Sequence, residues 1–308
     1  MHDLTVASAN DRRRLQHRYR SRIKKGSKRE KLRKLMNGKG SDAGSRTSDS
    51  MINPWIDLEL HPISDGDYRL EQRKQFDAVG ALILSGFFTK KFVDTVVCQS
   101  VSRETDAFYV DSTHNVYLTD TNSEMPDDHP FNRQVVSSKG LIADDQIPVD
   151  SPLRDVYGDL GFKEFLCSLL QVKNIYPYDD LLSSINVHFA PNGRELGWHF
   201  DNSSFAVTTL LQAPQQGGEF QYVSDVRDAD SGEMAFERVA AILNQDEQPS
   251  QLSFEAGDLV LFRGRNALHR VTPTRGAVTR ILAVFAYNDQ PGIGLSTSAL
   301  QTFYGRTS

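Results

Sequence analysis

The chain has 308 residues, of which 39% are hydrophobic and 24% are charged, and its formal net charge is -5 at pH 7. These values are typical of a globular protein that forms one large domain, or one domain with an appendage. No apolar run approaches the roughly 20 residues of a membrane span, and the N-terminus lacks the apolar region of a secretory signal. Two cysteines, Cys98 and Cys167, are too few for a disulfide framework, so we expect a cytoplasmic protein.

The charges are distributed unevenly along the chain. Residues 1–50 contain 15 Lys and Arg against 5 Asp and Glu, whereas the remaining residues contain 20 against 35. The basic run ends in a Gly/Ser-rich stretch, GKGSDAGSRTSDS, of the kind that forms flexible linkers. We therefore predict a disordered basic arm at 1–50 and a single folded domain at 51–308. Three alternatives remain for the arm: binding of nucleic acid or another anionic partner, a targeting presequence, or a true start at Met51.

Two helices and a short strand are predicted at the beginning of the domain. The run RLEQRKQFDAVG predicts a helix that ends near Gly80, and Ala81–Leu84 predicts a buried strand directly after it. Thr89 is the expected N-cap of the second helix, because its hydroxyl can accept a backbone hydrogen bond there. The apolar residues of that helix follow helical spacing at Phe92, Val93, Val96, Val97 and Val101.

A third helix is predicted to begin at Ser151, with Pro152 in its first turn. Its apolar face is expected to continue to Leu169 and to include Leu160. The preceding segment, residues 112–150, is polar and rich in Asp, Pro and Asn, which predicts loops with short strands.

From residue 181 the sequence consists of short β-rich runs separated by turns that contain Gly or Pro. The runs are SINVHF, FAVTTLLQ, GEFQYV, QLSF, DLVLF, HRVTP and TRILAVFAY. Several short strands at close spacing favour an all-β sandwich or barrel. The predicted fold class is therefore α+β, with helical support at 51–180 and a jelly-roll core at 181–290.

Three residues of the β-rich half have the spacing of a metal site. His199 and Asp201 occur in GWHFDN, and residues two apart on a strand project to the same face. His269 follows the strand DLVLF, and strands of a barrel can face each other across its interior. Two His and one carboxylate on one face of an octahedral iron leave three positions open for a co-substrate and O2. The HxD pattern alone is weak, because a solitary His more often has a structural role.

Arg280 lies 11 residues after His269, within the apolar strand TRILAVFAY. A guanidinium there is explained if it binds a carboxylate in the barrel interior through two hydrogen bonds. The alternative is an ion pair between Arg280 and an aspartate of the core.

The motifs in this order resemble the 2-oxoglutarate/Fe(II) dioxygenases of the prolyl-hydroxylase type. They are FAPNGRELGWHFD, TTLLQAPQQGGEF and EAGDLVLFRGRNALHRVTPTRGAVTRILAVFAY. The resemblance implies a double-stranded β-helix, Fe(II) held by His199, Asp201 and His269, and O2 and 2-oxoglutarate as co-substrates. It also implies that Arg280 binds the far carboxylate of 2-oxoglutarate.

A narrower resemblance extends upstream through HNVYLTD, DDHPFNRQ and LIADDQIPVDSPL. These segments are similar to a clade of enzymes that act on free amino acids, which includes halogenases of the BesD and HalD kind and hydroxylating relatives. In the halogenases a small residue replaces the carboxylate of HxD and leaves a coordination position for chloride. Asp201 is intact in this chain, so the resemblance favours hydroxylation.

Arg133, Asn202 and Asn288 are the predicted substrate contacts. Arg133 is a candidate for an amino-acid carboxylate, Asn202 adjoins a metal ligand, and Asn288 would share the face of Arg280 on a regular strand. An ordinary structural hydrogen bond is the alternative for each. We therefore predict a hydroxylase of a free amino acid or a similar small polar metabolite. A peptidyl or protein hydroxylase and a catalytically silent jelly-roll binding protein are the alternatives, and the sequence leaves the oligomeric state open.

Overall fold

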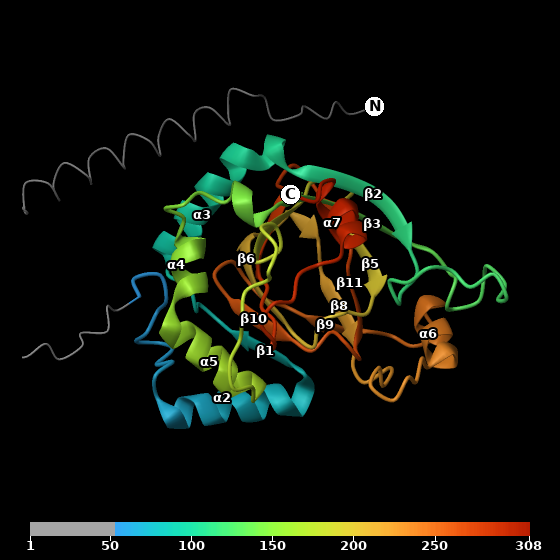
Figure 1. Ribbon diagram of the computed structural model, residues 1–308, viewed down its shortest axis with the longest axis horizontal. Helices are drawn as coiled ribbons and strands as arrows, with labels where there is room; N and C mark the ends of the chain where they lie inside the picture. The colour runs from blue at the N-terminus through green and yellow to red at the C-terminus, as the bar shows by residue number, and fades with distance from the viewer. Residues whose placement is uncertain (1–52) are drawn as a thin grey trace, which may run out of the picture. The chain divides into compact units, whose positions relative to one another are not determined.

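An 11-stranded antiparallel sheet forms the centre of the structure, a computed structural model that describes residues 53–308. The sheet curls into a half-barrel (Figure 1), which confirms the predicted jelly-roll class. Residues 54–308 belong to one compact unit. The basic arm predicted at 1–50 lies outside the described residues, so its interpretations stay predictions.

The strands pair in an order that differs from their order in the chain. In sheet order they are β1 (Ala81–Leu84), β10 (Leu259–Phe262), β6 (Ala206–Gln212), β13 (Arg280–Phe285), β4 (Ile185–Ala190), β3 (Val135–Ile142), β5 (Leu196–His199), β11 (Leu268–Val271), β8 (Phe220–Val223) and β9 (Ser250–Leu252). A further strand, β2 (Phe108–His114), pairs with β3. A separate two-stranded sheet joins β7 (Gln216–Gly217) to β12 (Thr274–Arg275).

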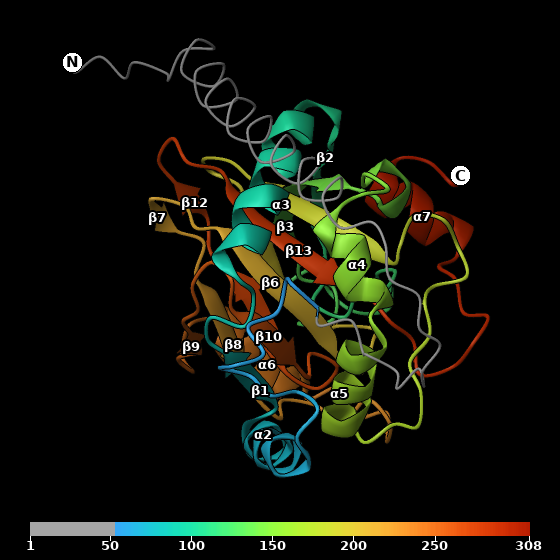
Figure 2. The same cartoon turned by 90° about the vertical axis from the view of Figure 1, so that its left-hand side faces the viewer.

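Helices cover the outer face of the part of the sheet that contains β6, β13 and β4. They are α2 (Gly66–Val79), α3 (Lys90–Arg103), α4 (Pro152–Gly158) and α5 (Leu160–Leu170). Figure 2 shows α3 and α4 in front of β6 and β13. Phe92 of α3 and Phe162 of α5 are fully buried in one apolar cluster with strand residues such as Phe285. Two short helices, α6 (Phe236–Leu243) and α7 (Thr297–Tyr304), and 3-10 turns at Glu104–Asp106 and Asp144–Gln146 complete the described elements.

The two faces of β13 have different environments, which follows from the alternation of side chains along a strand. Ile281 and Ala283 are buried in the cluster formed with the helices. Arg280, Leu282 and Val284 instead line the cavity inside the half-barrel. The strand therefore presents its arginine to the interior, as the sequence predicts.

The first two predicted helices and the short strand are confirmed. The helix α2 ends at Gly80, whose φ of 73° places it in the left-handed region that glycine adopts without strain. Thr89 is the N-cap of α3, and its side chain accepts a hydrogen bond from the backbone N–H of Phe92. The strand Ala81–Leu84 follows α2 directly.

The single helix predicted after Ser151 is wrong, because two helices meet at Asp159. This residue ends α4 and caps α5 in an extended conformation, and its side chain accepts a hydrogen bond of 2.7 Å from the N–H of Phe162. Asp side chains compete in this way with helix continuation. Leu160, which was expected on the apolar face, is consequently 73% exposed.

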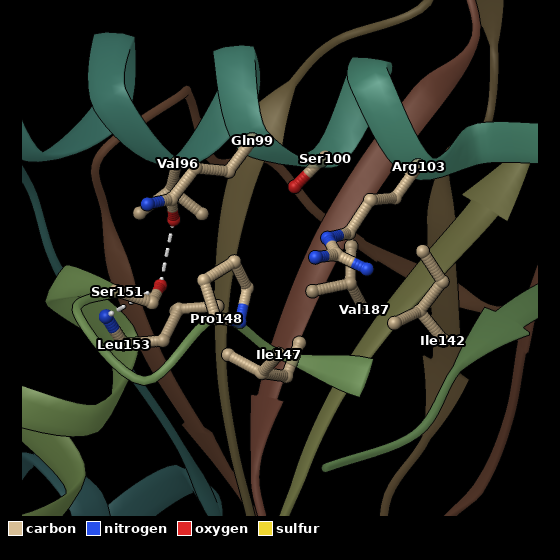
Figure 3. A pocket seen from close by; sticks show the side chains of 10 residues that line it. All are labelled: Val96, Gln99, Ser100, Arg103, Ile142, Ile147, Pro148, Ser151, Leu153 and Val187. Atoms are coloured by element: carbon tan, nitrogen blue, oxygen red, sulfur yellow. Dashed lines mark hydrogen bonds between the residues drawn. The ribbon is translucent and has the colours of Figure 1, made fainter. Parts of the chain in front are cut away.

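Ser151 caps α4 as predicted and also joins it to α3 (Figure 3). Its hydroxyl donates to the side-chain oxygen of Gln99 over 2.7 Å and accepts from the N–H of Leu153. A cavity of about 10 Å³ lies beside this contact. That is room for roughly one water molecule, so this pocket is a packing defect of the core.

The prediction of loops with short strands at 112–150 is wrong in part, because β2 and β3 form a long antiparallel pair. In the sheet β3 lies between β4 and β5. Its inner positions include the polar residues Ser137 and Lys139, which hide the apolar alternation typical of a strand. The helix α6 also interrupts the segment that was expected to be entirely β.

Two further observations concern membrane-spanning helices and disulfide bonds. In residues 53–308 no helix is both long and apolar enough to cross a membrane. Cys98 and Cys167 are not joined by a disulfide.

Candidate active site

His199, Asp201 and His269 meet at one end of the half-barrel. His199 is the last residue of β5 and lies directly opposite His269 of β11 in the strand register. The Nε2 atoms of His199 and His269 are 3.6 Å and 3.5 Å from Oδ1 of Asp201. Within residues 53–308 these three form the one group of His, Cys, Asp and Glu side chains close enough to share a metal ion.

Hydrogen bonds fix the orientation of both imidazole rings. Nδ1 of His199 lies 2.8 Å from the carbonyl of Gly197, and Nδ1 of His269 lies 3.0 Å from the carbonyl of Ala267. A carbonyl only accepts, so each Nδ1 carries the proton and each Nε2 presents a lone pair. Both lone pairs are thus free to bind a metal beside the carboxylate of Asp201.

The charges of His199 and Asp201 also fit a divalent metal. Burial and the neighbouring His269 together lower the pKa of His199 to about 3, so its imidazole stays neutral. Burial would raise the pKa of Asp201, but the neighbouring His269, His199 and Lys139 outweigh it and hold this pKa below its usual value. Metal–ligand bonds of about 2.1 Å at right angles place neighbouring ligand atoms roughly 3 Å apart. The observed spacings are slightly wider, so the residues fit an iron of the 2-His-1-carboxylate type.

Gly264 packs directly against the carboxylate of Asp201. A Cβ atom at position 264 would lie 1.9 Å from Oδ2 of Asp201 and 2.9 Å from Cε1 of His269. The backbone N–H of Asp201 also donates to the carbonyl of Gly264 over 3.0 Å. The missing side chain at position 264 therefore lets two of the three candidate ligands take their positions.

We expect Gly264→Ala to weaken Fe(II) binding by roughly 10- to 100-fold, the effect of losing a group that orients a ligand. The added methyl group must push the carboxylate of Asp201 away from the two imidazoles. Anaerobic Fe(II) titration would measure the affinity. Gly158→Ala is the matched control, since no atom lies within 4 Å of the Cβ it would add. Equal affinities for the two variants would contradict the positioning role of Gly264.

A cavity of about 260 Å³ extends from the three residues into the half-barrel. Most of its lining is apolar, which excludes water from the region beside the candidate metal. Aromatic side chains contribute much of this lining, namely Tyr178, Phe205, Phe220, Phe254, Phe262, Phe285 and Tyr287. Two cationic side chains, Lys139 and Arg280, also reach it.

Arg280 is 6% exposed, and its guanidinium makes no hydrogen bond or ion pair with any residue in 53–308. Burial lowers its pKa to about 10, which leaves the group charged at neutral pH. Gly218, at φ 65°, makes room for this side chain, because a Cβ there would lie 2.9 Å from Cδ of Arg280. A buried cation without a partner is costly, so an anion bound beside Arg280 would stabilise the site.

The three predicted substrate contacts lie away from the cavity lining. Arg133 donates to Oδ1 of Asn244 and to the carbonyl of Leu243, at the C-terminal end of α6. Asn202 is exposed, and its carbonyl accepts from Arg265 over 3.2 Å. A substrate-binding role for Arg133 and Asn202 stays a prediction.

Asn288 connects two loops near Tyr178. The strand β13 ends at Phe285, so the regular alternation from Arg280 does not extend to this residue. Its backbone pairs with Tyr176 in an isolated bridge, and its Nδ2 donates to the carbonyl of Ile293 over 3.2 Å. Its predicted contact with substrate likewise stays a prediction.

Asp180 holds the same two loops together. Its carboxylate accepts hydrogen bonds from the backbone N–H groups of Leu182 and Ser183 at 2.9 Å and of Leu295 at 3.0 Å. Burial raises the pKa of Asp180, but these hydrogen bonds outweigh it and lower the pKa below its usual value.

We expect Asp180→Asn to reduce the free energy of unfolding by about 1–2 kcal/mol at neutral pH, since hydrogen bonds to the charged form are lost. The pKa of Asp180 is lower in the folded protein than in the unfolded chain, where it is roughly 3.9. This stabilisation is therefore present above the unfolded pKa and disappears as the pH falls through the pKa of the folded state. Urea unfolding at pH 7 and at lower pH would show the two proteins converging. Asp179→Asn changes an exposed neighbour and is the control. A difference that persists in acid would contradict the charge-based explanation.

Sequence reasoning missed Lys139, Gly264 and a hydrogen-bonded chain behind His199. In this series of hydrogen bonds, Nε2 of His114 lies 2.6 Å from the hydroxyl of Ser137, and the same hydroxyl accepts from the N–H of Gly197 over 3.0 Å. The carbonyl of Gly197 in turn orients His199. Only the pairing of β3 with β5 brings these residues together, so the local sequence carried no signal for them.

Comparisons with known proteins agree with this geometry. A family model described as halogenase D matches residues 67–299. The search of curated proteins gave no match. Among solved structures, SnoN, a non-heme alpha ketoglutarate dependent epimerase from nogalamycin biosynthesis, is similar with a TM-score of 0.52 at 13% identity, over 72% of this chain and 81% of that one.

Two further solved structures show the same fold. One is the alpha ketoglutarate dependent carbocyclase SnoK, also from nogalamycin biosynthesis, with a TM-score of 0.50 at 12% identity, over 77% of this chain and 92% of that one. The other is SnoN in complex with Fe3+, alpha ketoglutarate and nogalamycin RO, with a TM-score of 0.51 at 12% identity, over 75% and 93%. At these identities the likeness concerns the fold alone.

Proposed function

We propose that this chain, which belongs to the halogenase D family of 2-oxoglutarate/Fe(II) oxygenases, hydroxylates a free amino acid or a similar small polar metabolite, because the carboxylate of Asp201 is intact. The bond attacked is an unactivated C–H bond. His199, Asp201 and His269 hold the iron in this proposal, and Arg280 binds the far carboxylate of 2-oxoglutarate.

The intact carboxylate of Asp201 is the observation that favours hydroxylation over halogenation. Its Oδ1 lies within 3.6 Å of both imidazole Nε2 atoms, where it takes the third protein position on the metal. A halide would need a coordination position of its own beside the co-substrate and O2. With Asp201 bound, that position is filled by the protein.

Each residue of the site has a defined task in this reaction. The three ligands hold the metal, Arg280 orients 2-oxoglutarate, and the apolar lining keeps water away from the reacting atoms. Bound Fe(II) supplies the redox chemistry by which 2-oxoglutarate, O2 and a substrate C–H group yield succinate, CO2 and an alcohol.

The volume of the cavity supports a small substrate. The cavity of about 260 Å³ must accommodate both 2-oxoglutarate and the group to be hydroxylated. This volume is slightly below the roughly 300–1,000 Å³ of typical small-molecule sites. A peptide substrate would need an open groove beside the metal. The silent binding protein is disfavoured because it has no use for three metal ligands together with a buried, unpaired arginine.

Reconstitution with Fe(II) and 2-oxoglutarate under anaerobic conditions, followed by O2, tests the proposal. The twenty common amino acids would be screened by mass spectrometry in the presence of chloride, with succinate measured in parallel. We expect one added oxygen atom on one amino acid, and no product from Asp201→Ala. A chlorinated product from the unmodified protein would contradict hydroxylation. Succinate without any product would redirect the search to peptides, and no succinate at all would contradict the oxygenase itself.

A further inference from the structure

Lys139 and Arg280 lie in one row across three neighbouring strands. Arg280 of β13 pairs with Ala190 of β4. On the other side of β4, Gly140 of β3 pairs with Phe189, and the same register sets Lys139 opposite Ala190. Strands are about 4.8 Å apart, so the two cationic residues lie roughly 10 Å apart at their Cα atoms, one on each side of Ala190.

The small side chain of Ala190 leaves space between the two long ones. Lys139, Ala190 and Arg280 all line the cavity. Side chains of one row project to the same face of the sheet, so Lys139 and Arg280 both point into the cavity. Their ammonium and guanidinium groups enter it on the two sides of Ala190. An anion above Ala190 would lie between them.

Within residues 53–308, neither Lys139 nor Arg280 forms an ion pair with a carboxylate. Nζ of Lys139 contacts Nδ1 of His188 over 3.4 Å, which is long for a hydrogen bond, and that imidazole brings no negative charge. Burial, together with the charge of Arg280, lowers the pKa of Lys139 to about 8, although the charge of Asp201 opposes this shift. Asp201 is a candidate metal ligand, so its charge is needed elsewhere when iron is bound.

We propose that Lys139 is a second anchor for the distal carboxylate of 2-oxoglutarate, which it holds above Ala190 together with Arg280. The co-substrate carries two carboxylates, and the one far from the metal meets two cations in an apolar cavity. This inference rests on the co-substrate of the family and is independent of the substrate proposed above.

A clamp of two cations makes the site selective among 2-oxo acids. The oxo-acid end of every such compound can bind the metal, but only a compound with a distal carboxylate satisfies both Lys139 and Arg280. A chain of the same length that ends in a methyl group would leave both cations unpaired, which is unfavourable in a buried site. Lys139 is thus a specificity-determining residue for the co-substrate.

Calorimetric titration of the Fe(II)-loaded protein under anaerobic conditions and without substrate would test the proposal. The ligands are 2-oxoglutarate and 2-oxovalerate, which differ at the distal end only. We expect Lys139→Met to weaken 2-oxoglutarate binding by roughly 10- to 100-fold, as for a lost charged hydrogen bond, and to leave 2-oxovalerate binding nearly unchanged. Lys139→Arg should recover part of the affinity, and Lys173→Met, at an exposed position, should have no effect.

Two results would overturn the proposal. One is unchanged 2-oxoglutarate binding in Lys139→Met, and the other is an equal loss for both ligands, which would indicate a structural role. Thermal unfolding without ligand separates folding from binding, because removing an uncompensated buried cation should leave the melting temperature equal or higher. If Lys139→Met does not fold, Lys139→Gln is titrated in its place. Failure of the substrate screen leaves these titrations interpretable, since they contain no substrate.

Discussion

Asp201→Ala is expected to lower the affinity for Fe(II) by on the order of 100-fold or more and to abolish turnover. Loss of a residue that merely orients a ligand weakens metal binding by roughly 10- to 100-fold, so loss of the ligand itself should reach at least the upper end. The change also removes the carboxylate that lies beside the two imidazoles, in a cavity that Lys139, Arg280 and Glu195 also line.

Anaerobic Fe(II) titration and succinate formation would measure the two effects separately. Asp150→Ala is a suitable control, because Asp150 is an exposed carboxylate away from the cavity. Retained Fe(II) affinity together with hydroxylated product in Asp201→Ala would contradict the assignment of Asp201 as a ligand. If Asp201→Ala still binds iron and gives a chlorinated product, the location of the active site is supported, and residue 201 determines whether the product is hydroxylated or chlorinated.

Arg280→Met is expected to raise the dissociation constant of 2-oxoglutarate by on the order of 100-fold or more while the affinity for Fe(II) stays unchanged. Removing one partner of a buried charged pair weakens binding by about 2–5 kcal/mol, and each 1.4 kcal/mol is tenfold. Arg280 is buried and makes no hydrogen bond or ion pair within residues 53–308, which supports our proposal that the far carboxylate of the co-substrate is its partner.

The same titration with Fe(II) bound would measure this affinity. Arg275→Met is the matched control, because Arg275 is exposed on the neighbouring strand β12. Kinetically, the apparent KM for 2-oxoglutarate should rise far more than that for the substrate. Equal dissociation constants for Arg280→Met and the unmodified protein would show that the carboxylate binds elsewhere.

The metal triad could be predicted from the sequence because its geometry is mostly local. His199 and Asp201 are two residues apart at the end of a strand, so any extended backbone brings them together. His269 was expected on a strand that faces β5 across the barrel interior, but β11 instead pairs directly with β5 and the register sets His269 opposite His199. Arg280 was recognisable because a charge stands out in an apolar strand.

Residues that depend on tertiary contacts could not be predicted. The strand that carries Lys139 reads as polar, because Ser137 and Lys139 occupy positions on its inner face where an apolar residue is expected. Gly264 is one glycine among 21, and only its contact with Asp201 distinguishes it. Asn288 was placed by strand alternation, which fails because β13 ends three residues earlier.

The contact between Gly264 and Asp201 couples these two positions in evolution. A Cβ atom at position 264 would lie 1.9 Å from Oδ2 of Asp201, so a side chain there requires the carboxylate to move. Replacing Asp201 by Gly or Ala would remove this clash, but the 2.9 Å distance to Cε1 of His269 would still restrict position 264 to small residues. In the other direction, a chain that had already acquired a side chain at 264 could accept aspartate at 201 only with the carboxylate displaced. Substitutions at the two positions are therefore not independent, and the effect of each depends on which comes first.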